Sequence, residues 1–202
     1  MTTLTRNLLA VAAVLLLASG CSLLTGPAPV AIDQYVLEYE AFGIAPQPGA
    51  PVLVVTTPRA HGGYDTSRMA YMQQAYGLRY FTMSRWADTP ARMLAPLLAE
   101  AVQETGRFQA VYAVPGSIVA DLRLDTELVQ LHQDFTRQPS VVHLALRAQL
   151  VDVRKGRVLV TRHFDVAVEA ESDDAYGGVV AANRALELLL SELAQFCAAG
   201  YN

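Results

Sequence analysis

The chain has 202 residues, a length that suits one domain with a substantial hydrophobic core. Its formal net charge of −4 and its isoelectric point near 5.5 argue against nucleic-acid binding, which requires a basic surface. It contains only two cysteines, which excludes a disulfide-rich scaffold.

The first 20 residues have the organisation of a secretory signal peptide. Arg6 supplies a positive charge, residues 8–18 form an uninterrupted apolar run, and the small pair Ser19-Gly20 precedes Cys21. The run is shorter than the roughly 20 apolar residues that a transmembrane helix needs. We therefore predict that residues 1–20 are a signal peptide that exports the chain.

The segment LLLASGCS around Cys21 resembles the lipobox of bacterial lipoproteins. This resemblance implies diacylglycerol on the Cys21 thiol and a further N-acyl chain, and no other cofactor is expected. Ala18 stands where a lipobox usually has leucine, with Leu17 one place earlier. Because Ser22 rather than Asp follows the cysteine, the resemblance implies sorting to the outer membrane, with the domain facing the periplasm. The alternative is an ordinary signal peptide followed by an incidental cysteine.

The mature chain is predicted to consist of a tether and one domain. Residues 21–32 contain Gly and Pro without any periodic pattern, which predicts a flexible tether. Residues 33–202 show no internal repeat and no second boundary, so we expect a single domain there. With Cys21 acylated, Cys197 has no partner for an intramolecular disulfide, and its apolar helical surroundings predict a buried, unreactive thiol.

The first half of this domain is predicted to contain short strands, a hairpin and a helix. Strands are expected at residues 34–40, 52–57 and 108–114. The Tyr-, Met- and Phe-rich segments 68–74 and 78–85, with Gly77 between them, predict a hairpin. Thr89-Pro90 places a capping hydroxyl before a proline, which predicts a helix that begins there and ends at Gly106.

The second half is predicted to be a meander followed by a helix. Apolar and polar residues alternate through three long segments, 120–128, 142–150 and 158–168. The alternation slips at Arg162, which indicates an edge strand or a bulge. A last helix is expected from the cap Ser172-Asp173-Asp174 to Gly200. The predicted fold class is α+β: an antiparallel or mixed sheet with a long three-stranded meander, covered on one face by two helices.

The histidines do not suggest a metal site. His61, His132, His143 and His163 include no pair at metal-ligand spacing within one helix. His143 and His163 fall on adjacent predicted strands and on the polar faces, but no carboxylate or thiol accompanies them. We therefore interpret them as part of a solvated face and expect no metal.

The carboxylates and serines do not suggest catalysis either. Asp121, Asp125 and Glu127 share one strand face with Arg123, which is typical of an exposed charged surface rather than an acid–base pair. No serine lies in a G-x-S-x-G turn. Gly177 and Gly178 open a helix without the strand and spacing of a phosphate loop. We expect the protein not to be an enzyme.

The aromatic hairpin is the feature most able to carry a function. One interpretation is core packing, because aromatic residues favour strands and one face of a hairpin is normally buried. The other is a partner-docking surface that includes Tyr71, Tyr76, Tyr80 and Met83, since Tyr and Met are enriched at interfaces. For Arg85 and Trp86 we favour a structural role that fixes the hairpin to the first helix.

Residues 68–94 resemble the signature of the ABC-type transport auxiliary lipoproteins. The matching features are Arg68 with Tyr71, Arg79-Tyr80-Phe81, Ser84-Arg85-Trp86-Ala87 and Pro90. Downstream features follow in the family's order, namely Thr105-Gly106-Arg107-Phe108, Ala120-Asp121 and Leu150-Val151-Asp152. The resemblance covers roughly residues 33–197.

The family includes the outer-membrane lipoprotein of the paraquat-inducible systems, whose members accompany an ABC transporter and a substrate-binding protein of the MCE (mammalian cell entry) type. The resemblance therefore implies that the chain is a non-catalytic, lipid-anchored periplasmic component that docks an MCE-type conduit for lipids, either alone or as a homo-oligomer. A lipid-binding carrier and an assembly chaperone for another envelope component are the alternatives. A carrier would have to hold its ligand between the sheet and the helices.

Overall fold

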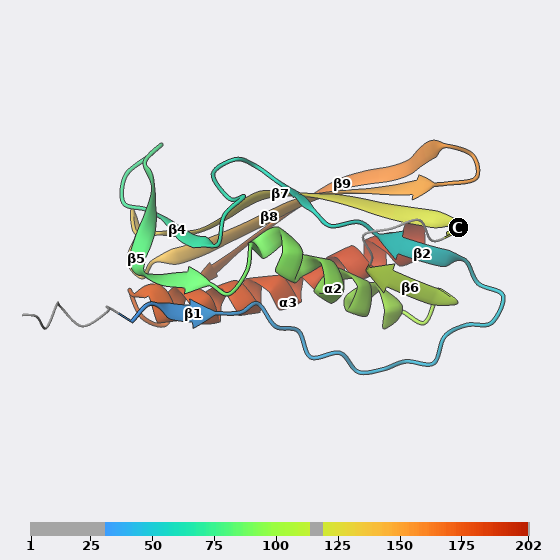
Figure 1. Cartoon of the computed structure of the whole chain (residues 1–202), viewed down its shortest axis with the longest axis horizontal. Helices are drawn as coiled ribbons and strands as arrows, with labels where there is room; N and C mark the ends of the chain where they lie inside the picture. Colours follow the sequence, from blue (N-terminus) through green and yellow to red (C-terminus); the bar gives the residue numbers. More distant parts are fainter. Residues whose placement is uncertain (1–30, 114–118, 202) are drawn as a thin grey trace, which may run out of the picture. The chain divides into compact units, whose positions relative to one another are not determined.

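Three long strands form the centre of the fold in the computed structural model, which describes residues 31–113 and 119–201 (Figure 1). They are β7 (Leu122–Asp134), β8 (Val141–Asp152) and β9 (Arg157–Glu169), and each is antiparallel to the next. The predicted meander is therefore confirmed, with each strand a few residues longer than its alternating segment. The predicted signal peptide, Cys21, Ser22 and most of the tether lie outside the described residues.

The other edge of β7 is paired with three short strands in succession, all parallel to it. β2 (Val52–Val55) pairs with the beginning of β7, β3 (Arg59–Ala60) with its middle and β4 (Arg68–Met72) with its end. A parallel pairing needs a long connection, so no local pattern in these short strands predicts it.

Further short strands extend the sheet beyond these three. β6 (Ala110–Ala113) lies parallel to β2, β5 (Leu78–Trp86) lies antiparallel to β4, and β1 (Asp33–Tyr35) lies parallel to β5. The described residues thus form an open, mixed sheet of nine strands, as the predicted class allows. The β4–β5 hairpin and β1 lie at one end of β7, and β2 and β6 lie at the other (Figure 1).

Two helices cover one face of this sheet, as predicted: α2 (Pro90–Gln103) and α3 (Ala175–Gly200) (Figure 1). The apolar side chains of β7 and β8 that point toward them are fully or almost fully buried, and these are Leu122, Leu124, Leu128, Leu144, Leu146 and Leu150. Each helix packs an apolar stripe against these side chains, and the two stripes include Leu94, Leu98, Leu186, Leu189, Leu190 and Leu193. Neither helix in the described part of the chain is long and apolar enough to cross a membrane.

The helix boundaries follow the predicted signals, with one correction. Pro90 is the first residue of α2, but the Thr89 side chain makes no capping hydrogen bond. Asp174 does cap α3, because its side chain accepts a hydrogen bond from the backbone N–H of Gly177 at 2.7 Å. After α2, Gly106 takes a φ of +64°, a conformation that glycine adopts without strain.

The strand predicted at residues 34–40 is shorter in the structure and ends at Tyr35. Residues 36–44, here called the N-terminal strap, follow it without a neighbouring strand. The Asn183 side-chain amide replaces that strand: its Oδ1 accepts from the Glu38 N–H at 2.8 Å and its Nδ2 donates to the Val36 carbonyl at 3.3 Å. Glu104 then accepts hydrogen bonds from the Tyr39 hydroxyl and from the Phe42 N–H.

His143 and His163 lie on the adjacent strands β8 and β9, as predicted, but they are not opposite each other. His143 lies opposite His132 on β7, whereas His163 lies opposite Arg147. His132 comes to lie opposite His143 because a bulge in β7 between Leu128 and Gln130 shifts the later part of that strand by one residue. His132 is thereby turned to the face away from the helices.

Arg162 lies on β9, which is an edge strand. Its guanidinium lies 4.8 Å from the centroid of the Phe164 ring and donates a hydrogen bond of 2.7 Å to Glu192 on α3. A register irregularity in the β8–β9 pair falls between Leu150 and Val151. The slip in the sequence pattern at Arg162 thus marks a charged side chain that an edge position tolerates by pairing with a helix.

Candidate functional site

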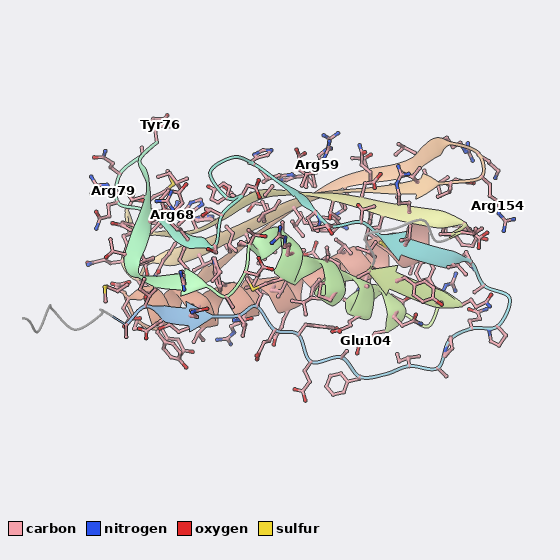
Figure 2. The ribbon with its side chains drawn as sticks, in the orientation of Figure 1. Arg59, Arg68, Tyr76, Arg79, Glu104 and Arg154 are labelled. Carbon is pink, nitrogen blue, oxygen red and sulfur yellow. The ribbon has the colours of Figure 1, made fainter. Side chains whose placement is uncertain are left out.

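The β4–β5 hairpin carries all four residues predicted to dock a partner. Ala70 pairs with Tyr80, Tyr71 with Arg79, and Met72 with Leu78, so a turn of five residues forms the tip. β4 also pairs with β7, and the far end of β5 pairs with β1, so the base of the hairpin is held from both sides. Figure 2 shows Tyr76 at the tip and Arg68 and Arg79 on the same hairpin.

Tyr71 is half-buried and belongs to an aromatic cluster. Its ring centroid lies 4.7 Å from that of Phe81 and 5.9 Å from that of Phe135, the second contact being edge-on. Phe135 follows β7, and its backbone N–H donates to the Met72 carbonyl at 2.8 Å. Tyr71 therefore fixes the hairpin to the loop between β7 and β8.

Tyr80 is also held by contacts within the chain. Its hydroxyl donates a hydrogen bond of 2.9 Å to the Gly63 carbonyl, and the Arg68 guanidinium carbon lies 3.9 Å from its ring centroid. These contacts connect the hairpin to the loop at residues 61–67. The ring is half-buried, so Tyr80 offers only part of its surface to a partner.

Tyr76 and Met83 are the two docking candidates that the structure leaves accessible. Tyr76 is 100% exposed and has a φ of 62° in spite of its side chain. Met83, on β5, is 45% exposed. The structure therefore divides the predicted docking set into two tyrosines that hold the hairpin together and two side chains that face solvent.

Arg68, Arg85 and Trp86 lie at the base of the hairpin. Trp86 is 4% exposed, joins the main core, and its backbone N–H donates to the Ser67 carbonyl at 2.8 Å. This is the position that a structural role requires. Arg68 and Arg85 are cross-strand partners, and both are exposed.

A cluster of polar rings next to the hairpin was not predicted. The Tyr64 hydroxyl lies 3.1 Å from His132 Nδ1, and the His132 ring stacks on His143 with centroids 5.4 Å apart. Asp134 Oδ2 lies 3.9 Å from His143 Nε2. Burial, and then the neighbouring His143, lower the pKa of His132, while the nearby Asp134 opposes this shift. Only the bulge brings these residues together, so the sequence pattern carries no signal for the cluster.

Several other charges on this face of the sheet are paired, in line with the predicted charged surface. Arg123 bonds Asp125 at 2.8 Å, and this hydrogen bond raises the pKa of Arg123. Glu127 lies between His61, at 3.5 Å, and Arg147, at 3.9 Å. Within residues 31–113 and 119–201, no group of three or more His, Cys, Asp or Glu converges to hold a metal ion.

The carboxylate pKa shifts do not point to a general acid. The aspartates with a resolved shift are all shifted downward, by hydrogen bonds from nearby N–H groups or hydroxyls that outweigh the cost of burial, and these are Asp134, Asp152, Asp173 and Asp174. A general acid that works near neutral pH needs a raised pKa instead. Cys197 is fully buried, and burial raises the pKa of its thiol to about 12, as expected for an unreactive cysteine.

The sheet–helix interior is filled with side chains, whereas an open groove lies on the outside of α3. This groove has a volume of about 580 Å³ and lies between the beginning of the N-terminal strap and the first turns of α3. Tyr35, Tyr39 and Tyr176 supply aromatic surface, and Glu38 and Glu187 supply negative charge. It is therefore an open surface groove of mixed polar and apolar lining rather than an enclosed chamber for an acyl chain.

Comparisons with known proteins agree with this architecture. A family model described as the ABC-type transport auxiliary lipoprotein component matches residues 35–194. The crystal structure of protein XCC0632 from Xanthomonas campestris, of family DUF330, is similar with a TM-score of 0.74 and 22% identity, over 83% of this chain and 95% of that chain. The crystal structure of an uncharacterized protein is similar with a TM-score of 0.61 and 15% identity, over 84% of this chain and 95% of that chain. No curated protein sequence gives a significant match.

Proposed function

Because the chain belongs to the family of ABC-type transport auxiliary lipoproteins, we propose that it is a non-catalytic component of an MCE-type system that moves lipids between two membranes. The family match over residues 35–194 carries this proposal, since it spans nearly the whole domain. Members of the family are membrane-anchored lipoproteins that assist an ABC transporter. The MCE partner, the outer membrane and the lipid cargo are the parts that we propose.

The anchor in this proposal is Cys21, with diacylglycerol on its thiol and an acyl chain on its amino group. Each buried CH₂ contributes roughly 0.8 kcal/mol, and stable anchoring takes more than one chain. Ser22 at the next position directs the lipoprotein to the outer membrane, where the domain faces the periplasm. The domain then acts as a docking element that stays at the membrane surface.

Tyr76 and Met83 are the residues that we propose to contact the conduit. Both face solvent, whereas Tyr71 and Tyr80 are engaged by Phe81, Phe135, the Gly63 carbonyl and Arg68. Tyr and Met supply contact area at low entropic cost, which suits a docking surface. A catalytic role is not part of the proposal, because the described residues bring together no recognisable set of catalytic groups.

The experiment is recovery of crosslinked partners from cells that express the tagged chain from its own locus. We expect an MCE-domain protein in the recovered complex, and we expect Tyr76→Ala combined with Met83→Ala to reduce its amount at equal expression. Gln73→Ala with Gln74→Ala is the matched control on the same tip. Repeated recovery of unrelated envelope proteins without an MCE protein would refute the proposal.

A further inference from the structure

The β4–β5 hairpin concentrates positive charge in an acidic protein. Between Asp65 and Asp88 the chain contains Arg68, Arg79 and Arg85 and no acidic residue, although its formal net charge is −4. All three arginines are exposed. The hairpin is therefore a basic projection from a domain of opposite overall sign.

The arrangement of Arg68 and Arg85 is unfavourable unless an anion lies between or beside them. They are directly opposite each other on β4 and β5, and like charges at such positions destabilise a sheet. In the part of the chain that the structure describes, no carboxylate oxygen lies within 4.0 Å of either guanidinium, or of that of Arg79. The Tyr80 ring holds the Arg68 guanidinium in place at 3.9 Å without neutralising it.

The chain enters the domain beside this arginine pair. β1 runs parallel to β5, with Asp33 opposite Ser84 and Gln34 opposite Arg85. Ten residues lie between Cys21 and Ile32. Such a segment reaches at most about 40 Å when fully extended and about 18 Å on average as a flexible chain. An acylated Cys21 therefore keeps the hairpin close to the bilayer that holds the anchor.

We propose that Arg68, Arg79 and Arg85 bind the phosphate groups of phospholipids in the membrane that carries the chain's own anchor. The guanidinium group presents two parallel N–H donors that match phosphate oxygens, and anionic lipids attract basic segments at short range. The Arg68 guanidinium lies over Tyr80, whereas Arg79 points to the other face of β5, so the two arginines bind separate phosphates on the two sides of the hairpin. The anchor and the hairpin then hold the domain at two points, which fixes its orientation on the bilayer. This inference rests on the lipid anchor of the proposed function. The short tether favours a lipid over an acidic protein surface as the occupant.

The test uses the full mature, acylated chain in vesicles of equimolar phosphatidylethanolamine and phosphatidylglycerol. A fluorophore attached at Thr82→Cys, an exposed position on β5, is quenched by lipids that carry a spin label on the headgroup. Cys197 is buried and does not compete for the label. We expect strong quenching for the labelled chain with all three arginines. Replacing Arg68, Arg79 and Arg85 by glutamine should lower the equilibrium constant for binding of the hairpin to the bilayer about 100-fold and abolish most of the quenching.

The matched control removes the same charge at the opposite end of the sheet. Arg154 and Lys155 lie in the turn between β8 and β9, and Arg157 is the first residue of β9. Figure 2 shows Arg154 at this end of the sheet, and replacing all three by glutamine should leave the quenching unchanged. High salt should reverse the quenching in the parent chain. Equal quenching in the parent and the hairpin variant, or an equal loss in both variants, would overturn the proposal.

Two other outcomes separate this inference from the proposed function. If the hairpin variant keeps its quenching but loses its crosslinked protein partner, the arginines bind an acidic protein surface, and the lipid proposal is wrong. If mass spectrometry shows no acyl chain on Cys21, the anchor of the proposed function fails. The arginines are then tested on the unacylated chain by sedimentation with the same vesicles, and no difference between parent and variant would refute their role.

Discussion

At the scale of single residues, His132 is the polar group whose burial has the clearest consequence. It is 8% exposed, and its only hydrogen-bonding neighbour in the described chain is the Tyr64 hydroxyl. A charge on His132 would be buried and would lie against the His143 ring, and both effects lower its pKa, while the nearby Asp134 only partly opposes them. The structure is therefore built for neutral His132.

The folded domain should lose stability on mild acidification because the pKa of His132 is lowered. Below about pH 6.5, the ordinary pKa of histidine, His132 takes up a proton more readily in the unfolded chain than in the folded chain. The free energy of unfolding therefore decreases as the pH is lowered. Thermal unfolding of the parent should thus show a lower midpoint at pH 5 than at pH 7, and His132→Phe should flatten this slope. His163→Phe, on exposed β9, is the control, and an equally flattened slope there would contradict the assignment.

A second window lies at lower pH and belongs to the aspartates. Asp134, Asp152, Asp173 and Asp174 have pKa values below their usual 3.8, so their contribution is present above that pH and is lost as the pH falls through the lowered values. The two windows are separated, which lets one titration distinguish His132 from the carboxylates.

Tyr76 should show opposite effects on stability and on docking. A residue with a side chain loses roughly 1 kcal/mol when it adopts a φ of 62°, whereas glycine adopts this conformation without that cost. Tyr76→Gly should therefore raise the free energy of unfolding by about 0.5–1 kcal/mol. The same change should reduce recovery of the conduit. Denaturant unfolding together with crosslinked recovery measures both effects.

Tyr80→Ala provides the contrast to Tyr76→Gly. It removes a half-buried ring, the bond to the Gly63 carbonyl and the support for Arg68, and we expect a loss of about 2 kcal/mol. A midpoint nearly equal to that of the parent would instead show that Tyr80 is primarily a docking residue.

At the scale of secondary-structure elements, close approaches decide how the helices sit on the sheet. Gln133 on β7 is 3% exposed, and its Nε2 donates to Ser140 Oγ at 2.9 Å while its Oε1 has no hydrogen-bond partner. A Cβ added at Gly178 on α3 would overlap this Oε1. The first turn of α3 can therefore approach β7 only because glycine occupies this position.

Gly178→Ala should destabilise the protein even though alanine favours helices. The helix propensity gain is about 1 kcal/mol, whereas overlap with a buried, hydrogen-bonded Gln133 costs about 1–3 kcal/mol and requires the helix to shift. We expect a lower urea midpoint with an unchanged slope. Gly62→Ala is the control, since nothing lies within 4 Å of the added carbon. A higher midpoint for Gly178→Ala would show that α3 is not fixed against Gln133.

Glu104 on the end of α2 holds the N-terminal strap through Tyr39 and Phe42. Burial, and then the hydrogen bond to Glu104, raise the pKa of Tyr39 to about 12. In Glu104→Ala, the absorbance titration of Tyr39 should move back toward its ordinary 10, and backbone amides of the strap should exchange faster in hydrogen-exchange mass spectrometry. Glu40→Ala, an exposed position on the same strap, should leave both unchanged.

At the scale of the whole molecule, the entry of the chain and the hairpin lie together at one end of the sheet, and β2 and β6 lie at the other. In the proposed function, what the domain contributes to transport is the position of its docking surface. In our proposals the acylated Cys21 and the three hairpin arginines place that surface on the membrane.

Cys21→Ser should therefore abolish transport function without changing the folded domain. Circular dichroism and the unfolding midpoint of the mature chain should match those of the parent, since Cys21 lies well before Asp33, the first residue of β1. Fractionation should show the variant in the soluble periplasmic fraction. Restored function in the unanchored variant would show that the anchor is dispensable.

Local patterns in the sequence predict most of the elements of this fold. Alternation of apolar and polar residues specifies β7, β8 and β9, and the apolar stripes specify α2 and α3, because burial of one face is a property that each segment carries by itself. The aromatic hairpin and its order relative to Trp86 and Pro90 also indicate the family. The face that each hairpin tyrosine presents does not follow from these patterns.

Long-range pairing decided the rest. The strands β2, β3 and β4 line up along one edge of β7 although about 70 residues of sequence separate Leu53 from Leu122, and no local periodicity encodes such a pairing. One extra residue in β7 turns His132 away from the helices and onto His143, since a shift of one residue reverses the face of every side chain after it. The sequence by itself thus indicated the three long strands, the hairpin and both helices, and it predicts an anchor at Cys21, but it missed β3 and made the first strand too long. Only the tertiary structure decided which tyrosines are free and which arginines lie together without a counter-ion, because those properties depend on neighbours that are distant in the chain.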